Sequence, residues 1–359
     1  MRSIILYPVS LLFRSAVVFR NKLFDWKILK AQEYPVPVIC VGNITVGGTG
    51  KTPMIEYLIR MLPLHCSIAV VSRGYKRKTK GFLLATEQST VDEIGDEPFQ
   101  LYRKFPEITV AVDENRCEAI EKLLQMPCKP DVILLDDAYQ HRYVKAGYSL
   151  LLVDYNRLPQ DDAMLPAGNL RESPSGQKRA DIVVITKCPA DISQTDISAI
   201  KQKLKILPRQ SVFFTGIRYG KLSPLFNMHQ KSLELSQLNV ATTVLLVTGI
   251  ASPNALVQQI EKQGCTVIHL RHADHHWYSK ADIESVAKKY HAILSPEKIV
   301  VTTEKDAMKL LFVNISDETV KNKMFYLPLE ICFLNNTQND FKQLIKNYVN
   351  ENSRNSLIS

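Results

Sequence analysis

Residues 45–52 read Thr-Val-Gly-Gly-Thr-Gly-Lys-Thr and follow an apolar run at 36–41. Glycines here let backbone N–H groups turn inward around phosphate oxygens, a lysine reaches the β- and γ-phosphates, and a threonine hydroxyl can ligate Mg²⁺. A helical pattern at 54–60 would add the positive end of a helix to the same site. The general pattern places Gly at the first position, where this chain has Thr45. We predict a nucleotide phosphate-binding loop made of Thr45, Val46, Gly47, Gly48, Thr49, Gly50, Lys51 and Thr52.

A second segment supplies carboxylates for the same chemistry. The apolar residues 132–135 are followed by Asp136 and Asp137, a pattern that indicates a buried parallel strand with an acid at its C-terminal tip. In phosphate-loop enzymes this acid holds Mg²⁺ directly or through water. We therefore predict that Mg²⁺ is held by Thr52 together with Asp136 or Asp137.

Composition narrows the class of protein. The chain has 359 residues, of which 45% are hydrophobic, so it can bury one large core or two smaller ones. Its net charge of +9 indicates an anionic partner, which could be phosphate, an acidic membrane or nucleic acid. Seven cysteines occur without a C-x-x-C pair. This spacing argues against a zinc site and is typical of free thiols in a reducing cytoplasm.

The N-terminal segment is unusually apolar from Ile4 to Phe19. A helix over 8–21 would be about 21 Å long at ~1.5 Å per residue, shorter than the ~30 Å hydrocarbon core of a bilayer. No small-residue cleavage site follows, so a signal peptide fits poorly. The polar exceptions share one helical stripe and are Ser10, Arg14, Asn21 and Asp25.

We expect residues 1–30 to form an amphipathic helix that lies on an anionic membrane surface, with Trp26 at the interface. The alternative is a helix that packs on the protein core. The basic residues expected to meet lipid head groups are Arg2, Arg14, Arg20, Lys22, Lys27 and Lys30.

The remainder alternates short apolar strands with helical segments, which predicts an α/β fold with a mostly parallel sheet flanked by helices, similar to phosphate-loop NTPases. Polar residues follow most strands, where such sheets bind ligands. The region 219–239 is more polar and less periodic, so we place a lobe boundary there. The expected division is a phosphate-loop core at 31–218, a linker at 219–240, a smaller α/β lobe at 241–345 and a polar tail at 346–359.

Two other short motifs could carry chemistry. Residues 95–98, Gly-Asp-Glu-Pro, place two acids beside a proline; they could equally be solvated acids in a turn or a helix start. Residues 274–278, Asp-His-His-Trp-Tyr, follow an expected strand. They could form a metal pair or an acid–base group, or simply a polar loop.

Seven motifs in order resemble the tetraacyldisaccharide 4′-kinase family, the lipid A 4′-kinases of Gram-negative bacteria. The similarity runs from the N-terminal helix to about Leu329. The family has Gly where this chain has Ala138, and it shares the Thr45 departure. The motifs lie at residues 42–53, 72–75, 95–98, 136–141, 166–172, 274–276 and 303–306.

The resemblance implies transfer of the ATP γ-phosphoryl group to the 4′-hydroxyl of a tetraacylated glucosamine disaccharide 1-phosphate. It implies a peripheral enzyme, which we expect to be a monomer, at the cytoplasmic face of the inner membrane, with ATP and Mg²⁺ as cofactors. Asp96 matches the catalytic base and His275 its orienting partner, while Lys51 would hold the phosphates. His275 lies in the second lobe, so this dyad would assemble only on lobe closure. The residues matched to substrate contacts are Arg116, Gln140, His141, Arg171 and Glu172.

Other nucleotide-binding classes fit less well. A partitioning-type ATPase would carry a second lysine early in the loop, where this chain has Val46. A GTPase would carry a base-reading acid after Thr186-Lys187-Cys188, where this chain has Pro189. A nucleic-acid-binding ATPase could use the positive charge, but no nucleic-acid-binding motif is visible. We therefore expect no nucleic-acid partner.

Overall fold

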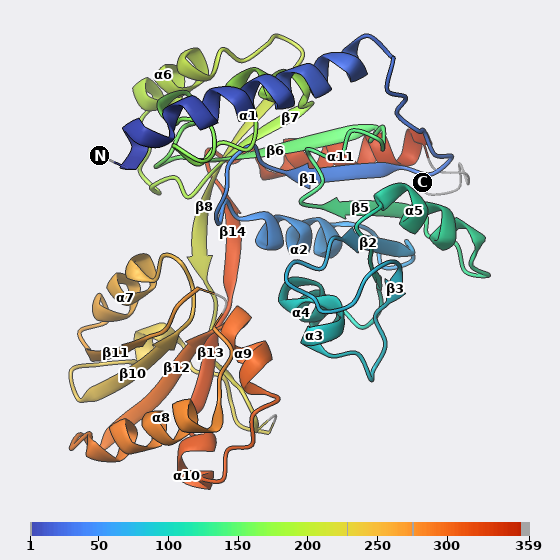
Figure 1. Ribbon diagram of the computed structural model, residues 1–359. Coiled ribbons are helices and arrows are strands. Elements are labelled where there is room, and N and C mark those ends of the chain that lie inside the picture. Colours follow the sequence, from blue (N-terminus) through green and yellow to red (C-terminus); the bar gives the residue numbers. More distant parts are fainter. Residues whose placement is uncertain (1, 228, 275, 353–359) are drawn as a thin grey trace. The chain divides into compact units, whose positions relative to one another are not determined.

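The computed structural model describes residues 2–227, 229–274 and 276–352, with side chains from residue 6 onward (Figure 1). The chain forms two compact units. The first contains the residues up to Ile217 and those from Ile331 onward, and the second contains Arg218–Glu330. The chain passes from one unit to the other within two strands, β8 (Ser211–Tyr219) and β14 (Leu329–Phe333).

The first unit is built on a nine-stranded sheet with the order β14-β8-β7-β6-β1-β5-β2-β4-β3. Neighbours from β8 to β4 are parallel, and β3 pairs antiparallel with β4. The strands not yet given bounds are β1 (Val38–Gly42), β2 (Ile68–Ser72), β3 (Leu83–Leu84), β4 (Thr109–Val112), β5 (Val132–Asp136), β6 (Tyr148–Asp154) and β7 (Ile182–Thr186).

The central strands are short apolar runs because they are buried on both faces, as every residue of β1, β2, β5 and β7 is. Hydrophobic clusters pack on the two sides of this sheet. The helices of this unit are α1 (Arg2–Asp25), α2 (Lys51–Met61), α3 (Val91–Ile94), α4 (Asp96–Lys104), α5 (Arg116–Gln125), α6 (Gln194–Leu204) and α11 (Gln338–Asn352), with 3₁₀ turns at Pro159–Asp161 and Pro174–Arg179.

The second unit has its own five-stranded sheet in the order β11-β10-β12-β13-β9. The first four strands are parallel and β9 is antiparallel, so the predicted α/β class is confirmed. Its elements are β9 (Ser223–Pro224), a 3₁₀ turn at Leu235–Gln237, β10 (Thr242–Thr248), α7 (Asn254–Glu261), β11 (Thr266–Arg271), α8 (Lys280–Ala292), β12 (Glu297–Thr303), α9 (Glu304–Leu310), α10 (Glu318–Lys321) and β13 (Met324–Leu327).

These bounds differ from the division expected from the sequence. The expected linker at 219–240 carries β9, which pairs with β13 and so belongs to the second sheet. The segment after Ile331 returns to the first unit because α11 buries Phe341, Ile345 and Val349 in one of its hydrophobic clusters. Part of the expected polar tail, up to Asn352, is therefore helix.

Helix α1 ends at Asp25, short of the expected residues 1–30, and three of the four residues of its polar stripe contact the rest of the protein, whereas Arg14 is exposed. Ser10 Oγ donates to the Met164 carbonyl at 2.9 Å, Asn21 Nδ2 donates to Glu172 at 3.2 Å, and Asp25 accepts from Arg142 at 2.7 Å. In the part of the chain that the structure describes, no helix is both long and apolar enough to cross a membrane.

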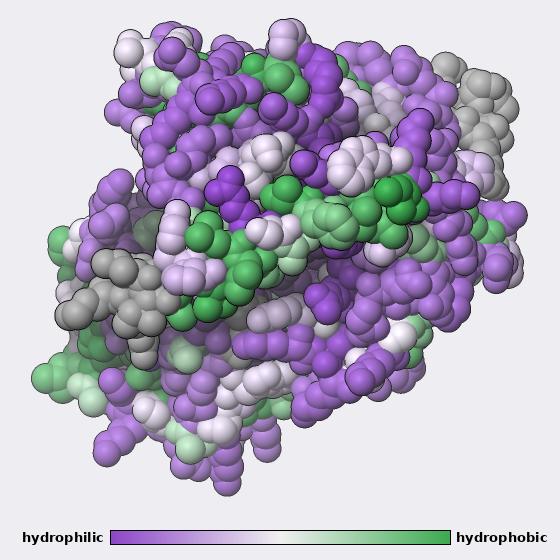
Figure 2. All heavy atoms as spheres, turned by 45° about the horizontal axis from the view of Figure 1, so that its top comes forward, coloured by the Kyte–Doolittle hydropathy of each residue, from purple (hydrophilic) through white to green (hydrophobic). Residues whose placement is uncertain are grey.

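The opposite side of α1 is apolar and open to solvent, and Figure 2 shows the resulting band of hydrophobic side chains over this helix. Hydrogen-bonded polar groups inward and apolar groups outward reverse the usual arrangement of a surface helix. The exposed large apolar residues of α1 are Tyr7, Val9, Leu11, Leu12, Phe13 and Phe19.

Candidate functional site

The glycine-rich loop connects β1 to α2 at the C-terminal edge of the first sheet. Gly47 and Gly50 have φ angles of 98° and 88°, a left-handed conformation that favours glycine. Asn43 Nδ2 donates to Thr49 Oγ1 at 2.7 Å and fixes the inner side of the loop. Lys51 and Thr52 then open α2, so that their side chains stand at the helix N-terminus as phosphate binding requires.

Residues from the neighbouring strand ends support this loop. Thr186 Oγ1, at the end of β7, donates to the Thr49 carbonyl at 2.9 Å. Arg157, just after β6, donates from Nη2 to the Val46 carbonyl at 2.7 Å, and its guanidinium covers Gly47. The sequence analysis missed Arg157, because a lone arginine in an unpatterned loop carries no local signal.

Asp136 ends β5 beside the start of the loop, in register with Val41 of β1. It is 2% exposed, and its Oδ2 accepts from Ser72 at 3.1 Å. Its Oδ1 is buried without a hydrogen-bond partner among the described residues. Burial, with the nearby charges of Glu97 and Asp137, raises the pKa of Asp136 to about 7, against the opposing effects of Lys51 and Ser72.

Asp137 has a different environment. It has a left-handed φ of 47°, Lys51 Nζ lies 3.6 Å from its Oδ1, and Arg171 Nη1 donates to both carboxylate oxygens at 2.9 Å. Burial opposes ionisation, but the charges of Lys51 and Arg171 outweigh it and lower the pKa of Asp137. One acid of the pair is therefore neutralised by cations, while the other has an uncompensated buried oxygen.

The motif at 95–98 forms a helix start rather than a solvated turn. Asp96 is the first residue of α4 and is buried. Gly95 has a φ of 90°, and a side chain there would meet the backbone of Gly74 at 3.2 Å, so glycine allows these two loops to approach. Glu97 lies close enough to Asp136 to raise its pKa. Glu97 was quoted in the motif but was not predicted as a site residue.

Basic side chains gather around Arg116 at the start of α5. Arg116 is buried and donates to the carbonyls of Asp113 and Glu114 at 3.2 Å. Burial lowers the pKa of His141 to about 4, and the charges of Arg116, Arg20 and Arg73 act in the same direction. The imidazole is consequently neutral at pH 7. These groups could bind an anion. Arg73 stood within a quoted motif but was not predicted.

Glu172 and Gln140 form hydrogen bonds with each other and with other groups of the protein. Glu172 is 1% exposed and accepts from Arg179 at 2.9 Å on both oxygens, as well as from Gln140 at 2.8 Å. Gln140 also donates to the Asn43 carbonyl at 2.8 Å. Both oxygens of Glu172 are therefore hydrogen-bonded within the protein, and the substrate contacts of Glu172 and Gln140 stay predictions.

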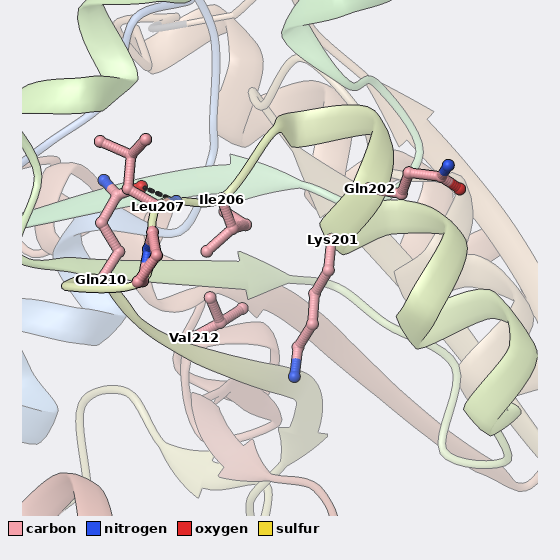
Figure 3. Close-up of a pocket in the computed structure, with 7 residues that line it drawn as sticks. Lys201, Gln202, Ile206, Leu207, Gln210 and Val212 are labelled. Carbon is pink, nitrogen blue, oxygen red and sulfur yellow. Dashed lines mark hydrogen bonds between the residues drawn. The ribbon is translucent and has the colours of Figure 1, made fainter.

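The second unit carries the motif at 274–278 after β11. His275 lies outside the described residues, so its predicted pairing with Asp96 stays a prediction. A separate cavity of about 460 Å³ lies in the first unit near the start of β8, and none of the residues that line it belongs to a predicted motif (Figure 3). Its lining residues are Lys201, Gln202, Ile206, Leu207, Pro208, Gln210 and Val212.

Comparison with known proteins gives consistent matches. The family model described as tetraacyldisaccharide-1-P 4′-kinase matches residues 2–350. A Tetraacyldisaccharide 4′-kinase of Bacteroides thetaiotaomicron is 47% identical over 362 residues, covering 99% of this chain and 95% of the relative. One of Flavobacterium johnsoniae is 45% identical over 349 residues, covering 97% of each chain. The crystal structure of the "apo" form of LpxK from Aquifex aeolicus in complex with ATP is similar at a TM-score of 0.74 and 26% identity, covering 97% of this chain and 100% of that chain.

Proposed function

This chain belongs to the tetraacyldisaccharide-1-P 4′-kinase family and is a kinase of lipid A biosynthesis, and from that premise we propose how its residues carry out the reaction. The proposed donor is ATP, and the proposed acceptor is the 4′-hydroxyl of a tetraacylated glucosamine disaccharide 1-phosphate. The observation that carries the proposal is the placement of Lys51 and the glycine-rich loop beside two acids of opposite pKa shift.

Mg²⁺ fits Asp136, the acid whose buried Oδ1 has no hydrogen-bond partner among the described residues. The buried Oδ1 of Asp136 is a natural oxygen ligand for a hard cation, and Thr52 opens the adjacent helix. Asp137 is already bound by Arg171 and Lys51, so we assign Asp136 the direct contact and Asp137 a supporting one. When bound, Mg²⁺ would neutralise charge that develops on the transferring phosphoryl group.

Asp96 is the proposed general base. The 4′-oxygen forms a bond to the γ-phosphorus as the bond from that phosphorus to the β,γ-bridging oxygen breaks, and ADP leaves. The hydroxyl proton passes to the Asp96 carboxylate, which the first turn of α4 holds in place. Lys51 and the loop amides hold the phosphates in line, since phosphoryl transfer depends mainly on positioning and charge stabilisation.

The basic side chains around Arg116 are the proposed site for the substrate's anionic head group. Arg116 and Arg171 are the predicted contacts, and we add Arg73 because its charge acts on both Arg116 and His141. A neutral His141 can still donate one hydrogen bond and accept another. Arginine suits the 1-phosphate because its planar fork binds phosphate oxygens in pairs.

The apolar face of α1 is the proposed membrane contact. Because Ser10 and Asn21 bind other parts of the protein, the outward face offers mainly apolar side chains to a bilayer, with Trp26 and basic residues such as Lys22 at its end. We propose that the protein is a peripheral monomer at the cytoplasmic face of the inner membrane, where its acylated substrate would lie.

Charged substitutions on this face should release the protein from membranes. Leu12→Asp and Phe19→Asp replace side chains that are 73% and 60% exposed, so the fold should persist. Burying one such side chain is worth about 1.5–3 kcal/mol, so each substitution should weaken binding to anionic vesicles by about tenfold or more. High salt should release the intact protein only partly, because it screens basic residues but not inserted apolar ones.

Vesicle co-sedimentation measures this effect, and Leu64→Asp is the matched control because Leu64 is an exposed leucine in the same unit but outside α1. The control should bind vesicles as the unsubstituted protein does. Unchanged sedimentation of the double variant Leu12→Asp/Phe19→Asp would show that the apolar face does not insert.

Because the pKa of Asp136 is raised, ionisation of this carboxyl destabilises the folded protein when no metal is bound. The folded protein holds this proton up to about pH 7, whereas the ordinary pKa is 3.8, so the carboxyl's contribution to stability is full below pH 3.8 and is lost as the pH rises through 7. Asp136→Asn should therefore raise the unfolding temperature at pH 8 in chelator while abolishing Mg²⁺-dependent turnover. The gain should shrink toward pH 4. Thermal unfolding at both pH values checks this, and an equal gain at both would contradict it.

The choice of nucleotide and the molecule that stimulates its turnover distinguish the proposed kinase from other phosphate-loop proteins. Hydrolysis or transfer with ATP should respond to the lipid disaccharide and not to nucleic acid, and GTP should be a poor donor. Stimulation by nucleic acid with no response to the disaccharide would instead favour a nucleic-acid-binding ATPase.

A further inference from the structure

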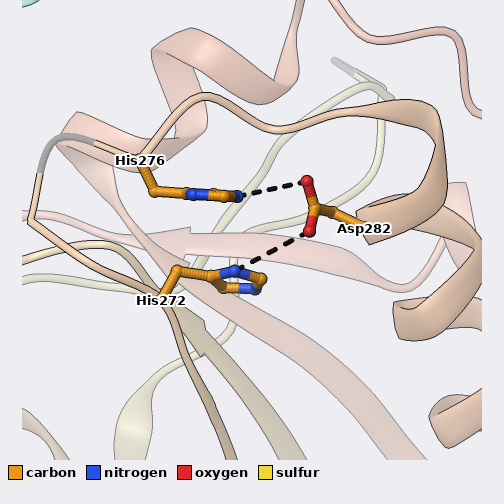
Figure 4. Close-up of side chains that lie close together, drawn as sticks. All are labelled: His272, His276 and Asp282. Atoms are coloured by element: carbon orange, nitrogen blue, oxygen red, sulfur yellow. Dashed lines mark hydrogen bonds and ion pairs between the residues drawn. The ribbon is translucent and has the colours of Figure 1, made fainter.

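The second unit brings two imidazoles and one carboxylate together. His272 directly follows β11, His276 lies in the loop beyond it, and Asp282 belongs to the first turn of α8. Their potential ligand atoms lie within 4.8 Å of one another. Figure 4 shows the two rings lying over one another, each with a nitrogen directed at a different oxygen of Asp282.

Local structure holds each of these residues in position. The His272 backbone N–H donates to the Thr248 carbonyl at 2.7 Å, which extends the contact between β10 and β11. Asp282 forms a capping box with Ser279, whose backbone N–H and hydroxyl both donate to Asp282 Oδ2 at 2.7 Å. The His276 backbone N–H donates to the Ala273 carbonyl at 3.1 Å. Backbone or capping contacts thus position all three residues before any ligand binds.

The spacing of the donors suits a shared ion better than it suits direct pairing alone. His276 Nε2 lies 3.1 Å from Asp282 Oδ2, whereas His272 Nδ1 lies 3.9 Å from Asp282 Oδ1, too far for a hydrogen bond. The ring centroids are 4.3 Å apart and the planes are inclined by 22°. Two ligand atoms bound about 2.0–2.2 Å from one tetrahedral ion lie roughly 3.3 Å apart. This value falls between the two nitrogen–oxygen distances of 3.1 Å and 3.9 Å.

We propose that His272, His276 and Asp282 form a binding site for a transition-metal ion of the zinc class. Two imidazole nitrogens and one carboxylate oxygen are a donor set that zinc accepts, with a fourth position left for water or an anion, whereas Mg²⁺ prefers oxygen ligands alone. The site uses no cysteine, so the cysteine spacing in the sequence gave no sign of it. It does not depend on the kinase assignment.

Such an ion would join the start of the loop after β11 to the first turn of α8. His272 and His276 would both be ligands, so the ion would link both residues to α8; the sequence between them holds three residues. His275 is one of the three, and any effect of the ion on turnover through His275 rests on the proposed function. The test therefore measures metal binding itself.

Co²⁺ is the probe, because it replaces zinc and gives visible absorption bands when tetrahedrally coordinated. The full-length protein, first stripped with chelator, should bind one equivalent saturably, and a large excess of Mg²⁺ should not displace it. His272→Ala and Asp282→Asn should each weaken Co²⁺ binding at least tenfold. Asn at position 282 keeps an oxygen for the Ser279 contacts, so this variant should fold normally by circular dichroism.

The matched control is His291→Ala. His291 Nε2 pairs with Asp317 Oδ2 at 2.7 Å in the same unit, and the described residues place no third donor of this kind beside them. This variant should bind Co²⁺ as the unsubstituted protein does. Absence of saturable Co²⁺ binding, or an equal loss in His291→Ala and His272→Ala, would overturn the proposal.

Discussion

Lys51→Ala should abolish phosphoryl transfer while leaving the protein folded. Lys51 opens α2 directly after the predicted phosphate-binding loop. Removing a charge that stabilises the transferring phosphoryl group is expected to cost about 10³-fold or more in turnover. The fold should persist, because Asp137 keeps its contacts with Arg171 and α2 keeps its buried apolar face. Initial-rate assays with circular dichroism on the same sample measure both parts.

Lys203→Ala provides the comparison, since Lys203 pairs with Asp161 at 2.6 Å on the surface of the same unit. Removing this lysine should leave turnover within a factor of about two, because Lys203 is not a residue of the predicted site. The fold should also persist, since an exposed ion pair contributes only about 0–1 kcal/mol to stability. A folded Lys51→Ala variant with near-normal turnover would show that the glycine-rich loop does not hold the transferring phosphates.

Asp96→Asn and His275→Ala should each lower turnover by roughly 10²–10⁴-fold, the range expected for losing acid–base assistance. Asn keeps the size of Asp96 at the start of α4 but cannot accept the proton. Asp92→Asn, on the preceding helix α3, removes an exposed acid paired with Lys78 and should leave turnover unchanged.

The double variant tests whether the two residues act as one unit. If His275 serves only to orient Asp96, Asp96→Asn/His275→Ala should be little slower than the slower single variant. Losses that multiply in the double variant would mean that Asp96 and His275 contribute separately and do not form a dyad.

The phosphate-binding loop could be predicted from sequence because its elements are contiguous. A buried strand, a glycine-rich turn and a helix start follow one another within residues 38–61, so local patterns contain all the information. The same holds for Asp136, since an apolar run that ends in an acid marks both a buried strand and its functional tip. The resemblance then added Asp96 and His275, which no local pattern could pair.

Long-range packing could not be predicted in the same way. The polar stripe of α1 is visible in the sequence, but only the fold shows that Ser10 meets Met164 and Asn21 meets Glu172, more than 150 residues away. The return of α11 to the first unit depends on Phe341 and its neighbours finding a cluster formed by distant strands. The motif that contains Glu172 likewise gives no sign of Arg179 and Gln140, which bind it in the folded protein.

The most direct test of the central claim is to analyse the product formed from ATP, Mg²⁺ and the tetraacylated disaccharide 1-phosphate in detergent. Mass spectrometry should show the addition of one phosphoryl group, and phosphorus NMR should place it on the 4′-oxygen, with ADP formed in equal amount. ATP hydrolysis without a phosphorylated disaccharide, or a new phosphate at another position, would contradict the account.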